Sequence, residues 1–232
     1  IDVGSVPDKS INWMRRKLPL LIDHDVDNSK ARILLEKSVP NSLRPLVLYK
    51  AFPEATFIHL VRDGRAVTES AMRMWATPPE KGYLLDKLRY FPWGNVRYAL
   101  WYIWNQLSGL FKTSPTIWGP RYKGIESDVE EQPLHILCAK QWFYCVKIAF
   151  NQLSEIPSER VLTVRYEDLM GDSSVLSDLC RNLGVVPEQV VEYHKKNVRD
   201  GENDKWKSSL SAEQQHDINS VFDDLPPTIK EF

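Results

Sequence analysis

Long hydrophobic runs and an excess of charge of one sign are both missing from this 232-residue chain. No apolar run approaches the roughly 18 residues that cross a bilayer, so we expect no membrane span. Lysine and arginine number 30 and aspartate and glutamate 31, which gives a net charge of −1. Wholesale binding to nucleic acid or to an anionic membrane is therefore not expected. Any site for an anion must be local.

Cysteine is also scarce, and its three positions argue against a disulfide framework. Cys138 and Cys145 lie seven residues apart in one helical pattern, about 10 Å along the helix axis, which is too far for a disulfide. Together with Cys180 they fall on apolar faces, and no C-x-x-C spacing is present. We interpret them as reduced core residues and expect no metal cofactor. Reduced cysteines favour a cytoplasmic location.

The sequence has no visible signal peptide, no internal repeat and no low-complexity tract. It begins at Ile1, without Met, in the irregular segment IDVGSVPDKS. That beginning indicates a piece of a longer protein. The length suits one α/β domain, so we expect residues 1–232 to form a single domain that is incomplete at its N-terminus.

Three short segments, residues 32–37, 56–61 and 160–166, have the composition of β-strands. TFIHLV, at 56–61, is almost continuously apolar, as expected for a strand buried on both faces of a parallel sheet. Helical patterns alternate with these strands, which predicts an α/β fold with a mostly parallel central sheet flanked by helices. Helices are expected over residues 41–52, from Asp63 to before Pro78, over 134–149 and 173–184, from Pro187, and after an N-cap at Ser211.

Aromatic residues concentrate in residues 80–127, which hold four of the eight tryptophans. We interpret this segment as an insertion within the domain, with one amphipathic helix near residues 95–111. Two roles stay open for it: an acceptor pocket or lid, and a helix that simply packs on the core. A membrane-surface role is disfavoured, because the polar face lacks a Lys/Arg cluster.

The stretch FIHLVRDGRAVTES, residues 57–70, runs from a predicted strand directly into a helix. Ligands of parallel α/β sheets bind at the carboxyl ends of the strands, and Lys37, Arg62 and Tyr166 each lie at such an end. The helix N-terminus offers free N–H groups and a positive dipole end. Arg62 adds a planar fork of donors that suits a phosphate. This pattern predicts an anion site.

Ser70 is the second candidate in this stretch. It shares a side of the helix with Val67, Ala71 and Met74, which we expect to face inward, where a hydroxyl needs a partner. An anion bridging Arg62 and Ser70 would supply that partner. The alternative is a serine bonded to the carbonyl four residues earlier, next to a surface arginine.

The loop VRDGENDKWKSSL, residues 198–210, supplies further candidates. Arg199 is a cation, Gly201 permits close backbone approach to an anion, and Trp206 offers a flat stacking surface. By itself this loop also fits an ordinary solvated charged segment.

Together these motifs resemble the PAPS-dependent sulfotransferase family, in which 3′-phosphoadenosine 5′-phosphosulfate (PAPS) donates a sulfuryl group to a hydroxyl or amine. In that family a strand is followed by Arg and, eight positions later, by Ser, and both bind the 3′-phosphate. Here the matching residues are Arg62 and Ser70. The resemblance implies a three-layer, P-loop NTPase-like fold and PAPS as co-substrate. It also implies a small-molecule, glycan or peptide acceptor.

The second 3′-phosphate element of the family has the form Arg-Lys-Gly, with Trp-Lys five residues after the Gly. Arg199, Gly201 and Trp206 keep this spacing, but Asp200 replaces the Lys. VRYEDL, at 164–169, is similar to the segment whose Tyr contacts the adenosine, which implies that role for Tyr166.

The segment at 34–67 most resembles the branch that contains tyrosylprotein and many bacterial and algal sulfotransferases. In that branch the lysine matching Lys37 acts on the sulfuryl group, because a cation stabilises the charge that develops on the leaving phosphate. A salt-bridged lysine at a strand end is the alternative for Lys37. The resemblance covers about residues 32–76 and 161–210. Its tyrosylprotein branch works in the Golgi lumen, which is the alternative location.

Two departures from the family pattern stand out. The Gly-rich, Ser/Thr-containing loop that cradles the 5′-phosphosulfate is not found in residues 1–31, and Val39 takes the place of the His that serves as base in cytosolic members. Two classes therefore stay open. One is a sulfotransferase, and the other is a non-catalytic nucleotide-binding or interaction module with the same fold. A P-loop kinase is disfavoured, because no G-x-x-x-x-G-K-[ST] motif occurs.

Overall fold

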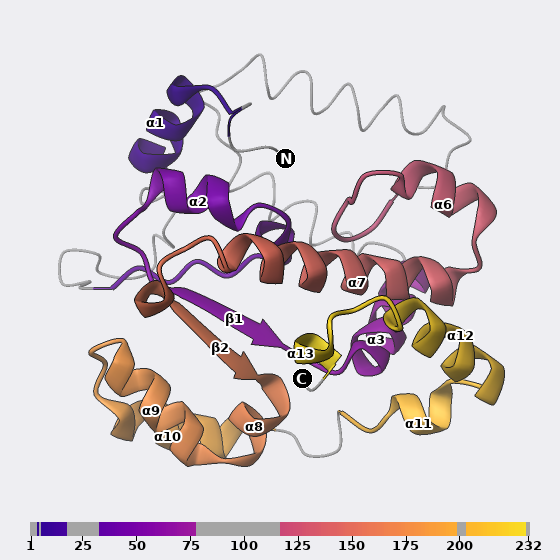
Figure 1. Cartoon of the computed structure of the whole chain (residues 1–232). Coiled ribbons are helices and arrows are strands. Elements are labelled where there is room, and N and C mark those ends of the chain that lie inside the picture. The colour runs from indigo at the N-terminus through magenta and orange to yellow at the C-terminus, as the bar shows by residue number, and fades with distance from the viewer. Residues whose placement is uncertain (1–3, 5, 18–32, 78–116, 199–202, 231–232) are drawn as a thin grey trace.

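The computed structural model of the chain describes residues 4, 6–17, 33–77, 117–198 and 203–230. Helices are labelled α, 3₁₀ helices η and strands β, as in Figure 1. In chain order the elements are α1 (Asp8–Lys17), η4 (Val39–Leu43), α2 (Pro45–Ala51), β1 (Phe57–Val61), α3 (Gly64–Ala76), α6 (Ile125–Glu131), α7 (Leu134–Leu153), η5 (Ser158–Arg160), β2 (Val161–Arg165), α8 (Tyr166–Gly171), α9 (Ser173–Asn182), α10 (Pro187–Asn197), α11 (Trp206–Ser209), α12 (Ala212–Phe222) and α13 (Pro227–Lys230).

The sheet consists of β1 and β2, which pair in parallel. The register joins Phe57 to Val161 at one end and Val61 to Arg165 at the other. Both strands were predicted from sequence, and their parallel pairing is confirmed. Helices flank the pair, so the fold is a mixed α/β fold (Figure 1). Because the strands run in the same direction, their carboxyl ends meet at one edge.

The predicted strand at 32–37 is wrong over residues 33–37, which the structure describes as irregular. A strand needs a ladder of backbone hydrogen bonds to a neighbour, and this segment has none among the described residues. Its apolar side chains are exposed instead: Ile33 is 51% exposed, Leu34 47% and Leu35 75%. The described sheet therefore has two strands, fewer than the central sheet that the sequence predicts.

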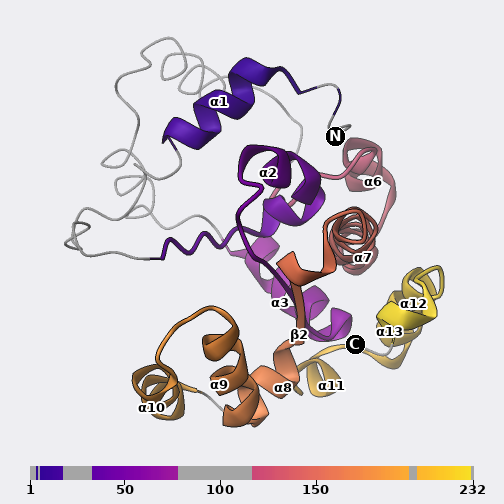
Figure 2. The ribbon, with the colours of Figure 1, turned by 60° about the vertical axis from the view of Figure 1, so that its left-hand side comes forward.

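The long helix α7 is the scaffold of the molecule and begins at Leu134, as predicted. It packs against α3, α12, α2 and η4 (Figures 1 and 2). The core beside it contains Val61 at the end of β1, Phe143 and Val146 of α7, and Leu225 and Ile229 near the C-terminus. The carboxyl end of β1 is thus anchored to the middle of α7 by apolar packing.

The three cysteines are free and buried, as predicted for reduced core residues. Burial raises the pKa of Cys138 to about 12. Burial also raises the pKa of Cys145, although a hydrogen bond with Ser42 acts in the other direction. Neither thiol is a ready nucleophile, because the thiolate is the reactive form.

Helix α3 starts where the sequence predicts, with Asp63 as its N-cap. Its buried side differs from the expected stripe. The buried residues include Ala66 and Thr68, whereas Met74 is 46% exposed. The reason is that α3 packs against α7, α11 and α12, so three neighbouring helices rather than one determine which side is buried. Ser70 is consequently only half-buried.

The remaining helix boundaries follow the predicted caps closely. Gly184 has a φ of +68° and ends α9 in a Schellman motif, with Val185 N bonded to Cys180 O at 2.8 Å. Ser211 caps α12 in a capping box. The helix predicted at 41–52 is divided into η4 and α2, because Pro45 starts a new helix at its first position. The helix predicted near 95–111 lies outside the described residues.

Gly64 allows α3 to begin against two aromatic rings. A Cβ at this position would lie 2.6 Å from Phe222 ring atoms and 2.8 Å from Trp142 Cε3. We expect Gly64→Ala to lower the free energy of unfolding by about 1–3 kcal/mol, because one of the rings must move. Urea unfolding measures the change.

Gly171 provides the matched control, because it also lies in a helix and a Cβ there meets nothing within 4 Å. We expect Gly171→Ala to change the free energy of unfolding by less than about 0.5 kcal/mol or to stabilise slightly. Equal effects of the two substitutions would show that the close contact at Gly64 has no energetic weight.

Candidate functional site

Three segments that lie far apart in sequence meet at the carboxyl end of the sheet. Arg62 follows β1, Tyr166 follows β2, and Asn203 belongs to the loop before α11. The parallel register pairs Val61 with Arg165, so the next residue of each strand leaves the sheet side by side with the other. The sequence predicted this convergence for Arg62 and Tyr166, which the structure brings together.

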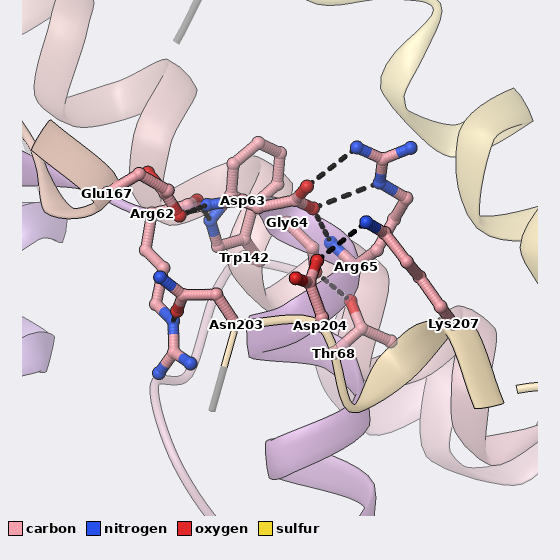
Figure 3. Close-up of polar contacts among 10 residues, drawn as sticks. All are labelled: Arg62, Asp63, Gly64, Arg65, Thr68, Trp142, Glu167, Asn203, Asp204 and Lys207. Carbon is pink, nitrogen blue, oxygen red and sulfur yellow. Dashed lines mark hydrogen bonds and ion pairs between the residues drawn. The ribbon is translucent and has the colours of Figure 1, made fainter. Parts of the chain in front are cut away.

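The guanidinium group of Arg62 is held by an aromatic ring and an amide. Its Cζ lies 4.6 Å from the centre of the Tyr166 ring, in the range of a cation–π contact. Its Nε donates to Asn203 Oδ1 at 3.0 Å. Figure 3 shows the side chain of Arg62 extending alongside Asn203, away from Arg65. A half-buried guanidinium thus stands at the edge where parallel sheets bind ligands.

Arg65, the second arginine of the motif, makes different contacts from Arg62. Its Nε and Nη2 donate to the Asp63 carboxylate at 3.0 and 2.6 Å. Its guanidinium lies 4.1 Å from the centre of the Trp206 ring. Arg65 therefore joins the start of α3 to α11, and its charge is compensated by Asp63.

Asp63 is both a helix cap and an ion-pair partner. Its Oδ1 accepts the backbone N–H of Arg65 at 2.8 Å. Burial of the carboxyl group works against ionisation, but the hydrogen bonds from Arg65 and Ala66 and the charge of Arg65 outweigh it. The pKa of Asp63 consequently lies below its ordinary value. Asp63 is therefore a charged group at neutral pH.

Trp206 is a core residue in this structure. It is 7% exposed and belongs to a cluster with Ala66, Ala139 and Ile218. Arg65 covers part of its ring. The flat stacking surface that the sequence suggested is thus used largely for packing, and it anchors the loop that carries Asn203.

The other predicted site residues are not joined to Arg62 by any contact in the described part of the chain. Ser70 lies on α3, and its hydroxyl has no hydrogen-bond partner among the described residues. Lys37 is exposed in the irregular segment before η4. Arg199 and Gly201 lie outside the described residues. The roles of these four residues stay predictions.

Two residues that the sequence did not assign to the site contact the peptide group between Arg62 and Asp63. Trp142 Nε1 donates to the carbonyl oxygen of Arg62 at 3.1 Å. Glu167 Oε1 accepts the N–H of Asp63 at 3.1 Å. Trp142 belongs to an apolar helical stripe that indicates core packing alone. Glu167 follows Tyr166 directly, and that adjacency is the only signal in the sequence that could have found it.

A groove of about 530 Å³ opens beside Tyr166, between α8, α9 and α10. His194 faces this groove, and its Nε2 is buried without a hydrogen-bond partner among the described residues. The lining is mostly apolar, with a few polar groups. The groove is lined by Tyr166, Met170, Leu176, Val190, Tyr193, His194, Asn197 and Val198.

A metal site and a membrane-spanning helix would each leave a recognisable feature in the described ranges. Within them, no three His, Cys, Asp or Glu side chains gather in a way that could hold a metal ion. None of the helices described there is both long enough and apolar enough to span a membrane.

Comparison with known proteins agrees with the motifs. Residues 10–102 match the model of the sulfotransferase family. The matched range includes Lys37, Arg62 and Ser70. No curated protein and no solved structure matches the chain. The branch of the family therefore stays a prediction, and Tyr166 is linked to the site by its contact with Arg62.

The ion pair at the start of α3 makes stability depend on pH. Because the pKa of Asp63 is lower in the folded chain than its ordinary value of 3.8, its charge stabilises the fold above that value. The stabilisation is lost as the pH falls through the folded-state pKa. Asp63→Asn retains a capping side chain but removes the charge. We expect it to lower the free energy of unfolding by roughly 0.5–1 kcal/mol at neutral pH, since Arg65 is partly exposed and screened.

Urea unfolding at about pH 7, 5 and 3 measures the effect, and the difference between wild type and Asp63→Asn should shrink at the lowest pH. The matched control is Asp178→Asn, whose partner Arg181 is exposed on α9, so that little effect is expected at any pH. A difference for Asp63→Asn that grows on acidification would contradict the assignment.

Proposed function

We propose that this chain transfers a sulfuryl group from PAPS to a hydroxyl or amine acceptor. One observation carries the proposal: Arg62, in the segment that matches the sulfotransferase family, lies over Tyr166 at the carboxyl end of the sheet. A guanidinium suits a phosphate, and an aromatic ring beside a groove suits a nucleoside base. The pair offers both in one place.

The side chains present fit the 3′-phosphoadenosine part of PAPS. Arg62 is the proposed phosphate ligand, with Ser70, Arg199 and Gly201 added by the family pattern. Tyr166 and the groove next to it are proposed to receive the adenosine. Trp206 is buried under Arg65. We propose that it does not contact the ligand and supports the site by anchoring the loop that carries Asn203.

The reacting group is supplied by PAPS, whose sulfuryl moiety passes to the acceptor. In such transfers the protein contributes chiefly position and stabilisation of developing charge. We propose that Lys37 contributes a positive charge near the leaving phosphate. Its exposed position in an irregular segment leaves its side chain access to a ligand.

A second candidate function is binding of the nucleotide without catalysis. The observation that favours it is that Lys37 lies exposed in an irregular segment, whereas Arg62 and Tyr166 meet at the edge of the sheet. Binding of adenosine 3′,5′-bisphosphate together with no sulfuryl transfer to any acceptor, in this chain and in an N-terminally extended one, would support this candidate.

The first test concerns Arg62. A charge-assisted hydrogen bond contributes roughly 1.5–3 kcal/mol, so we expect Arg62→Ala to weaken the binding of adenosine 3′,5′-bisphosphate at least tenfold. Arg62→Lys should restore only part of the affinity, because lysine lacks the planar fork. Isothermal titration calorimetry measures both.

Arg160→Ala is the matched control for this test. Arg160 precedes β2 at the opposite end of the strand and donates to Glu54 O, so its removal should leave the affinity within about twofold of wild type. Equal affinity of wild type and Arg62→Ala would refute the assignment of Arg62.

The second test separates chemistry from binding at Lys37. We expect Lys37→Met to lower turnover with PAPS and a panel of hydroxyl acceptors at least tenfold, while the affinity for PAPS changes by less than about threefold. The reason is that the charge of Lys37 matters most when charge develops on the leaving phosphate. A large loss of PAPS affinity with unchanged turnover would show that Lys37 is only a binding residue.

A further inference from the structure

The peptide group between Arg62 and Asp63 is held from both sides. Its carbonyl oxygen accepts the indole N–H of Trp142 at 3.1 Å, and its N–H donates to Glu167 Oε1 at 3.1 Å. Figure 3 shows Trp142 and Glu167 converging on this peptide from α7 and α8. Both polar groups of one peptide are thus satisfied by side chains from segments distant in sequence.

We propose that Trp142 and Glu167 are positioning residues for Arg62. The plane of the peptide that follows Arg62 restricts its ψ angle, and with it the direction in which the side chain leaves the end of β1. The consequence for ligand affinity rests on the proposed function, in which Arg62 binds a phosphate. The effect on the Arg62 side chain itself does not.

Trp142 is a rigid member of the pair. Its ring packs on Phe222 with a centroid distance of 4.5 Å. The start of α3 at Gly64, two residues after Arg62, packs closely against the same ring. A Cβ at Gly64 would lie only 2.8 Å from Trp142 Cε3. The indole N–H is therefore presented by the scaffold helix in one fixed place.

Glu167 is placed by the sheet itself. It stands two residues after Arg165, the register partner of Val61, so its carboxylate reaches the backbone that leaves the neighbouring strand. Its second oxygen, Oε2, is buried without a hydrogen-bond partner among the described residues. A buried carboxylate oxygen without a partner lowers the stability of the fold. Fold stability alone therefore does not account for a carboxylate at position 167.

Both ends of Arg62 are held: two contacts bind its guanidinium group, and two hydrogen bonds bind the peptide group that follows it. Asn203 and Tyr166 hold the tip of the Arg62 side chain, while Trp142 and Glu167 hold its backbone. Fixing both ends lowers the entropy that Arg62 loses when it binds an anion, which is how a supporting residue raises affinity.

A purely structural role would satisfy the two backbone groups and affect stability alone. The decisive readout is therefore the Arg62 side chain, observed through its Nε–H signal in ¹⁵N NMR and assigned by its loss in Arg62→Lys. We expect Glu167→Ala and Trp142→Phe each to shift or broaden this signal in the chain without ligand. Glu167→Gln, which keeps an acceptor oxygen for the Asp63 N–H, should leave it in place.

The chain offers matched controls for both substitutions. Gln152 Oε1 accepts the N–H of Leu46 at 3.2 Å, and Trp75 Nε1 donates to Gln141 Oε1 at 3.3 Å. Neither of these hydrogen bonds involves Arg62 or Asp63. Gln152→Ala and Trp75→Phe remove bonds of the same kind. We expect neither to move the Arg62 signal.

The second arm measures calorimetrically the affinity for adenosine 3′,5′-bisphosphate. We expect Glu167→Ala and Trp142→Phe each to weaken binding roughly three- to tenfold. In an Arg62→Ala background they should cause no further loss, because they act through Arg62. Glu167→Gln should bind within about twofold of wild type.

The outcomes separate this inference from the proposed function. An unmoved Arg62 signal in both Glu167→Ala and Trp142→Phe overturns the positioning role, and so does an equal loss of affinity with and without Arg62. If the wild-type chain fails to bind the bisphosphate, the proposed function fails. The NMR arm then still decides the positioning role.

Discussion

The parallel pairing of β1 with β2 is the constraint on which the candidate site depends. Its register sets Val61 beside Arg165, so each residue that follows leaves the sheet at the same edge. Arg62 and Tyr166, more than a hundred positions apart, meet there for that reason alone. Parallel strands need long connections, and α7 supports one side of this pair. The sequence predicted a strand buried on both faces at 56–61, but Leu60 is 45% exposed and Val61 is the buried residue of β1.

The turn Arg62–Arg65 shows how neighbouring charges of the same sign acquire different roles. Arg65 is compensated by Asp63 and covers Trp206, which connects the first turn of α3 to the C-terminal helices. Arg62 instead points toward a ring and a neutral amide.

Much of the local structure could be predicted from the sequence. The cap at Asp63, the Schellman glycine at Gly184 and the capping box at Ser211 all depend on residues within a few positions of each other. The strands at 57–61 and 161–165 were recognised by their composition. The strand expected at 32–37 failed because a strand depends on a neighbour, and local composition does not reveal whether the neighbour is present.

The sequence by itself predicted an anion site at the end of β1 and put Tyr166 at the end of a neighbouring strand, because both follow from strand ends and residue spacing. Only the tertiary structure decided which arginine contacts Tyr166, that Trp206 is buried, and that Trp142 and Glu167 bind the peptide group after Arg62. These contacts join residues eighty or more positions apart. Their geometry depends on how α7 and α8 pack against the sheet, which no short sequence pattern encodes.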